Sequence, residues 1–169
     1  MSILKELEKT FADRQKPRQL VLNDHPHTEI YEDALHFQDA YWSSLTGDEL
    51  ERFSDAFYGF NPLAFCYFLP GALCASVREN LPGLLVIHAL IGMLDRSPDI
   101  SVWDTFFLER WTLLSKAECQ TVQQWILWLA GIEDTPFTQD TLTRAYETLG
   151  LLSSENEAFT RFRKSVIKF

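Results

Sequence analysis

Helix-start signals recur along this chain at intervals of roughly 15 to 20 residues, while signals for strands are nearly absent. In a capping box, a Ser or Thr caps the helix and a Glu three residues later returns the hydrogen bond. The three boxes are Thr46 with Glu49, Ser115 with Glu118, and Ser154 with Glu157. Asn61 followed by Pro62 is a further helix start. The pattern predicts an all-α fold, a single compact domain over residues 1–169 with about seven to nine helices.

Three segments indicate how these helices are arranged. The segment from Leu84 to Leu94 is hydrophobic nearly all round, which is typical of a helix at the centre of a fold. Residues 1–16 contain an amphipathic segment, which predicts a peripheral N-terminal helix. The helix that begins at Asn61 meets Pro70, where the missing backbone donor predicts a kink or a break. The sequence leaves open whether Pro70 acts as a hinge.

The charge balance excludes several classes of partner. The chain has 24 acidic and 15 basic residues, which gives a net charge of −9, and its pI is near 4.8. Affinity for nucleic acid or for an anionic membrane surface comes mostly from Lys and Arg, so neither partner is expected. An acidic excess favours docking onto a basic partner.

Cysteine usage and the N-terminal residues predict a cytoplasmic protein. Cys66, Cys74 and Cys119 each lie among apolar residues and form no paired motif, which is typical of reduced, buried thiols. The N-terminal residues lack the apolar core of a signal peptide. No segment approaches the roughly 20 apolar residues of a membrane-spanning helix.

Motifs for catalysis, metals and cofactors are weak in this sequence. His25 and His27 are separated by one proline and do not share a helix face, so we expect a solvated loop there and no metal site. His88 lies midway along the most apolar helix, where a hydrogen-bonded core histidine is expected. The sequence contains neither a nucleophile elbow nor a phosphate-binding glycine loop. It therefore predicts no enzyme, no cofactor and no metal.

Acidic residues are concentrated in the segment from Asp24 to Asp55. This segment holds nine acidic residues and a single basic one, Arg52, so its net charge is −8. Tyr and Trp side chains, which are enriched at interfaces, are interspersed with them. The combination predicts capture of a basic protein surface, and a solvated acidic face is the alternative. The predicted contact residues are Glu29, Asp33, Tyr41, Trp42, Asp48, Glu49 and Asp55.

Several short motifs resemble an uncharacterised bacterial family, one of the domains of unknown function. They are Tyr41-Trp42 ahead of an acidic helix, then Phe60-Asn61-Pro62-Leu63-Ala64-Phe65, Tyr67-Phe68-Leu69-Pro70 and, in the second half, Leu114-Ser115-Lys116-Ala117-Glu118. The chain departs from the family at Gly71, where such proteins carry another residue, and a looser helix is expected there. The resemblance implies a small helical bacterial protein and no activity.

Together these features favour an immunity-type protein, an inhibitor that neutralises a toxin or effector by direct binding. Toxic nucleases and pore-forming proteins are often basic, and an acidic inhibitor is their electrostatic complement. A second hypothesis is a small-ligand-binding protein or an enzyme whose site joins residues distant in sequence, such as His88 with Asp95 or the loop with His25 and His27. A third is an adaptor that holds a helix of another protein in an apolar groove.

Overall fold

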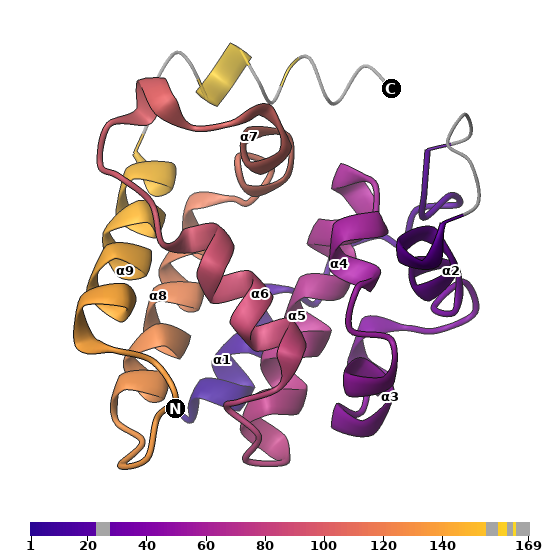
Figure 1. Ribbon diagram of the computed structural model, residues 1–169, viewed down its shortest axis with the longest axis horizontal. Coiled ribbons are helices and arrows are strands. Elements are labelled where there is room, and N and C mark those ends of the chain that lie inside the picture. The colour runs from indigo at the N-terminus through magenta and orange to yellow at the C-terminus, as the bar shows by residue number, and fades with distance from the viewer. Residues whose placement is uncertain (23–27, 155–158, 162–163, 165–169) are drawn as a thin grey trace.

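The computed structural model describes residues 1–22, 28–154, 159–161 and 164, and every regular element within them is helical (Figure 1). The α-helices bounded within these residues are α1 (Ile3–Thr10), α2 (Glu29–Leu35), α3 (Gly47–Arg52), α4 (Ala56–Gly59), α5 (Pro62–Arg78), α6 (Leu85–Leu94), α7 (Thr105–Trp111), α8 (Lys116–Ala130) and α9 (Gln139–Ser153). Two 3₁₀ helices are η1 (Trp42–Ser44) and η2 (Ile100–Val102). The predicted all-α fold is confirmed. The start predicted at Ser154 depends on Glu157, which lies outside the described residues.

Helix α5 is the centre of the fold. Every residue from Ala64 to Ser76 is buried, and α5 packs against α1, α3, α6, α7 and η1. The sequence predicted this place for the segment that forms α6, and that prediction was wrong. Leu85, His88 and Gly92 are exposed along one side of α6. Because apolar atoms contribute much of any protein surface, apolar content alone does not identify the central helix.

Helix α5 continues through Pro70, and the predicted break is not observed. A proline inside a helix removes one backbone hydrogen bond and costs about 3 kcal/mol. Tertiary packing offsets this cost, because burying one large apolar side chain contributes roughly 1.5–3 kcal/mol. Phe65, Phe68 and Leu73 of α5 are completely buried.

The N-terminal helix, predicted to be peripheral, packs into the core. Helix α1 lies against α5 and α8, and both Leu7 and Phe11 are completely buried. Just beyond α1, Arg14 donates a hydrogen bond from Nε to Glu118 at 2.9 Å and one from Nη2 to the carbonyl oxygen of Leu113 at 3.0 Å. These bonds join the N-terminal segment to the start of α8.

Helices α8 and α9 lie on one side of α5, and α2 and α3 lie on the other (Figure 1). Helices α8 and α9 pack against each other, with α1 against α8 and α6 against α9. On the opposite side, α2 packs against α4, while η1 and α3 pack against α5. We call residues 28–55, which include α2, η1 and α3, the acidic end.

Candidate functional site

Three of the seven predicted contact residues are exposed at the acidic end. Glu29 begins α2 and Asp48 lies in the first turn of α3, where a negative charge also interacts favourably with the helix dipole. Both side chains are exposed, and Tyr41, just ahead of η1, is 63% exposed. These side chains are accessible to a partner. Asp24 lies outside the described residues.

Asp33, Glu49 and Asp55 are half-buried and contribute to the fold of the acidic end. Asp33 accepts a hydrogen bond from the backbone amide of Asp55 at 3.2 Å, which joins α2 to the start of α4. Oε1 of Glu49 lies 3.0 Å from Nε2 of His36, whose ring stacks on Phe53 with the centroids 3.6 Å apart. Part of the predicted contact set therefore holds the acidic end together.

Trp42 is a core residue, which corrects its prediction as a contact for a partner. Its side chain is only 9% exposed, whereas the adjacent Tyr41 is exposed. The chain turns into η1 at this point, so neighbouring residues face opposite sides and the interspersed aromatic residues do not share one surface.

Two glycines allow the acidic end to lie close to the core. A Cβ atom at Gly71 would lie 2.6 Å from the carbonyl oxygen of Trp42, so the absence of a side chain lets η1 approach α5. The sequence led us to expect a looser helix at Gly71, whereas in the structure α5 makes a close contact with η1 at this position. A Cβ atom at Gly59 of α4 would collide with the carbonyl group of Ile30 in α2. Both glycines therefore position the elements that carry the exposed carboxylates.

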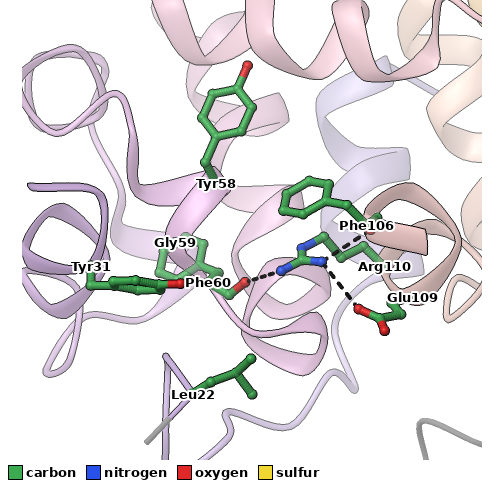
Figure 2. Close-up of a pocket in the computed structure, with 8 residues that line it drawn as sticks. All are labelled: Leu22, Tyr31, Tyr58, Gly59, Phe60, Phe106, Glu109 and Arg110. Carbon is green, nitrogen blue, oxygen red and sulfur yellow. Dashed lines mark hydrogen bonds and ion pairs between the residues drawn. The ribbon is translucent and has the colours of Figure 1, made fainter. Parts of the chain in front are cut away.

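A cavity of about 280 Å³ lies between α2, α4 and α7 (Figure 2). Its lining residues are Leu22, Tyr31, Tyr58, Gly59, Phe60, Phe106, Glu109 and Arg110. Aromatic side chains from three separate elements form much of its wall. Figure 2 shows the hydroxyl end of Tyr31 pointing toward the side of the cavity that holds Arg110, while the hydroxyl of Tyr58 points away from it.

Arg110, in the last turn of α7, is 6% exposed. Its guanidinium donates one hydrogen bond to the carbonyl oxygen of Phe60 at 2.9 Å and one to that of Phe106 at 3.1 Å. The Cζ atom lies 3.7 Å from the centroid of the Phe106 ring. Burial lowers the pKa of Arg110, because desolvation disfavours the charged form. Among the described residues, the Nε atom has no hydrogen-bond partner.

A second hollow of about 460 Å³ continues beyond Tyr58 and Phe106, which line both spaces. His88 and Gly92 of α6 and Arg96 complete much of its wall. His88 is exposed, so the expected core histidine is wrong. The reason is the position of α6, which has one side open to this hollow.

The structure does not assemble a site from His88 and Asp95. Asp95 accepts hydrogen bonds from Nε of Arg144 at 2.5 Å and from the hydroxyl of Thr141 at 3.2 Å, and it lines neither hollow. The hydrogen bond from Arg144 lowers the pKa of Asp95. The other site considered, the loop with His25 and His27, lies outside the described residues.

Cys66, Cys74 and Cys119 are all buried. Burial raises the pKa of Cys66 and of Cys74 to about 12, so these thiols hold almost no thiolate at neutral pH and are poor nucleophiles. Within the described ranges, no three or more His, Cys, Asp or Glu side chains gather as metal ligands would. None of the helices in that part of the chain has the length and apolar character needed to cross a membrane.

The sequence reasoning missed Arg110. The available signal was a lone arginine at helical spacing from Phe106 and Phe107 and adjacent to Trp111, in a segment rich in aromatic residues. An arginine among such residues is either buried or stacked, and here it is both.

The chain matches no protein-family model, no curated protein and no solved structure. The resemblance of its Tyr-Phe-Leu-Pro motif to a bacterial family stays a prediction.

Proposed function

We propose that the protein binds a basic protein partner through the acidic end and inhibits that partner by direct contact. The observation that carries the proposal is the concentration of exposed carboxylates in this one segment. These residues are Glu29, Glu32, Asp39, Asp48 and Glu51. None of them forms an ion pair with a Lys or Arg of the described residues.

Three carboxylates outside the acidic end form close pairs with arginines. Glu118 pairs with Arg14 at 2.5 Å, Asp95 with Arg144 at 2.5 Å, and Asp104 with another arginine at 2.8 Å. Paired charges largely cancel beyond a short distance, whereas unpaired ones add to the field around the protein. Such a field steers a basic partner toward the acidic end and raises the association rate.

Exposed apolar side chains lie in the same segment and supply contacts that hold a bound partner. Tyr41 is 63%, Ile30 39% and Leu35 37% exposed. Rings and aliphatic groups desolvated on binding dominate the energy of most interfaces. Nζ of Lys16 lies 4.9 Å from the centroid of the Tyr41 ring, an arrangement that a Lys or Arg of a partner can reproduce.

A toxin or effector with a basic active surface is the partner class we favour. An acidic inhibitor that covers such a surface blocks access to the anionic substrate or membrane on which the toxin acts. Binding that is strong, stoichiometric and sensitive to salt is the expected behaviour.

The experiment compares three tagged baits in a lysate of the native host, at low and at moderate salt. The first bait is the original chain. The second removes exposed charge from the acidic end by Glu29→Gln, Asp39→Asn and Asp48→Asn. The control removes the same charge from exposed residues near α8 and α9 by Glu133→Gln, Asp134→Asn and Glu147→Gln. Because the two variants have equal net charge, a difference between them reports position.

We expect one basic protein to be enriched by the original chain and by the control, and to be largely lost with the acidic-end variant. The purified partner should then lose its own activity on addition of one equivalent of the original chain. Equal recovery of the partner by all three baits would contradict the assignment of the acidic end. A partner that binds but keeps full activity would contradict the inhibitor function.

A further inference from the structure

The cavity of Figure 2 contains a buried positive charge that its surroundings neutralise poorly. The side chain of Arg110 is 7% exposed, and its ion-pair partner in the described residues, Glu109, is 3.8 Å away and 42% exposed. An exposed carboxylate is screened by water and compensates a buried cation weakly. Burying a charge without close compensation is costly, so a group with the opposite charge is favoured beside it.

The guanidinium also has hydrogen-bonding capacity left over. It carries five N–H donors in a planar fork. Carbonyl oxygens of Phe60 and Phe106 accept one bond each, and the Nε–H group has no partner among the described residues. A buried donor without a partner is uncommon in native proteins and requires an explanation. A ligand that accepts hydrogen bonds supplies one.

We propose that this cavity binds a carboxylate carried on a short apolar or aromatic body, with Arg110 holding the carboxylate. The walls match such a body, because Leu22, Tyr58 and Phe106 line the cavity together with the Tyr31 ring. Its volume of about 280 Å³ is at the lower end of the range for small-molecule sites. This proposal does not rest on the proposed function of the acidic end, although Tyr31 of that segment lines the cavity.

The charge of the cavity favours a carboxylate over a phosphate. Among the described residues that line the cavity, Arg110 is the single cation, and Glu109 places a negative charge at the edge. A dianionic phosphate would leave excess negative charge in a partly desolvated space. Arg96, beyond Phe106, already pairs with Asp104 at 2.8 Å. A monoanionic carboxylate balances Arg110, and its planar shape suits the guanidinium fork.

The test uses benzoate as the probe and benzamide as its neutral analogue of nearly equal shape. Isothermal titration of the whole chain measures both affinities. Nitrogen-15 NMR follows the Nε–H resonance of Arg110, which should shift on binding and exchange more slowly with water. Because a hydrogen bond to a charged group is strong, we expect benzoate to bind at least about tenfold more tightly than benzamide.

Two variants test the position of the site. Arg110→Lys keeps the charge and removes the planar fork, and it should weaken benzoate binding by about tenfold or more. Leu22→Trp fills the cavity from its exposed edge without altering Arg110, so it keeps the test decisive if the arginine variant fails to fold. Its control is Leu127→Trp on α8, at a leucine that is equally exposed, 50% in both cases.

Loss of benzoate binding in Leu22→Trp, with binding retained in Leu127→Trp, is the expected result. The proposal would be overturned by equal affinity for benzoate and benzamide, or by unchanged benzoate binding in Leu22→Trp. It would also be overturned if benzoate did not bind even at about 10 mM, a concentration at which weak binding is still detected.

The same carboxylate chemistry has two sources, a free small acid and the C-terminus of a peptide. A short peptide ending in Phe, with a free or an amidated C-terminus, separates them. Tighter binding of the free-acid peptide than of benzoate, abolished by amidation, assigns the site to a peptide C-terminus. Binding of benzoate with no binding of either peptide assigns it to a free small acid. Both outcomes support the carboxylate site.

Discussion

Replacing Gly71 by Ala should destabilise the fold, although this substitution usually stabilises a helix. Gly71 lies inside α5, where Ala is intrinsically favoured over Gly by about 1 kcal/mol. A Cβ atom there would lie 2.6 Å from both the carbonyl oxygen of Trp42 and Cδ1 of Leu45, inside the 3.4 Å at which ordinary contact begins. Overpacking a filled core costs about 1–3 kcal/mol. Because the Trp42 oxygen is backbone and cannot rotate away, we place the cost at the upper end and expect a net loss of roughly 1–2 kcal/mol.

Gly92 in α6 provides a matched control for Gly71. A Cβ atom at Gly92 would have no neighbouring heavy atom within 4 Å, and the residue is exposed. Gly92→Ala should therefore stabilise the fold by about 0.5–1 kcal/mol, because Ala has less conformational freedom to lose on folding. The chemical change is the same in both variants, so opposite signs isolate the contact with η1.

Urea unfolding followed by tryptophan fluorescence measures the free energy of unfolding of each variant. Thermal unfolding is an independent check, because 1 kcal/mol shifts the Tm of a domain of this size by about 2–4 °C. The reasoning is refuted if Gly71→Ala is as stable as the original chain while Gly92→Ala shows its expected gain. That result would mean that η1 does not pack on α5 at the distance described.

Three further predictions follow from single interactions in the core and at the surface. Ser76→Ala should lower the free energy of unfolding, measured in urea, by about 1–3 kcal/mol. The hydroxyl of Ser76 accepts a hydrogen bond from the buried indole N–H of Trp125 at 3.1 Å, and the substitution leaves that N–H without a partner. Unchanged stability would contradict that hydrogen bond. Cys66 and Cys74 should resist a thiol reagent at pH 8 in the folded protein and react fully in denaturant. The reason is that burial raises the pKa of each thiol to about 12. Rapid labelling of the folded protein would contradict this prediction, because it would show that the thiols are accessible. The pKa of Asp95 is lowered by the hydrogen bond from its arginine partner. This carboxylate therefore stabilises the fold fully at pH values above the unfolded Asp pKa of about 3.9. The stabilisation is lost as the pH falls through the lower pKa of the folded state. Asp95→Asn should therefore lower the urea midpoint more at pH 7 than at pH 2. An equal loss at both pH values would contradict the linkage.

The helix starts could be predicted because capping is a local interaction. Ser115 and Glu118 form the reciprocal box at the start of α8. Thr46 accepts a hydrogen bond from the backbone amide of Glu49 at 3.3 Å, which is the first half of a capping box. The Glu49 carboxylate, however, lies against His36, the residue that caps the C-terminal end of α2. A contact distant in sequence thus replaces half of a box that the spacing predicts, and the helix start is kept.

The identity of the central helix could not be predicted, because burial depends on contacts that sequence patterns do not record. Helix α5 contains Pro70, Gly71 and Ser76, which are poor residues for a core helix when judged by propensity. In the fold, Gly71 makes room for η1. Ser76 donates to the carbonyl oxygen of Leu73 at 2.7 Å and accepts from the indole of Trp125. Each apparent defect is resolved by a neighbour from another element.

The acidic end and the cavity differ in predictability for a related reason. Nine acidic residues with a single basic one in the same segment keep their net charge in almost any fold, so a count along the chain identifies them. The same count makes Glu109 and Arg110 neutral, because the two charges are adjacent. Adjacent residues on a helix point in different directions. The Glu109 side chain is therefore 42% exposed while that of Arg110 is buried, 3.8 Å away. A charge that cancels in the sequence is thus only weakly compensated in the cavity.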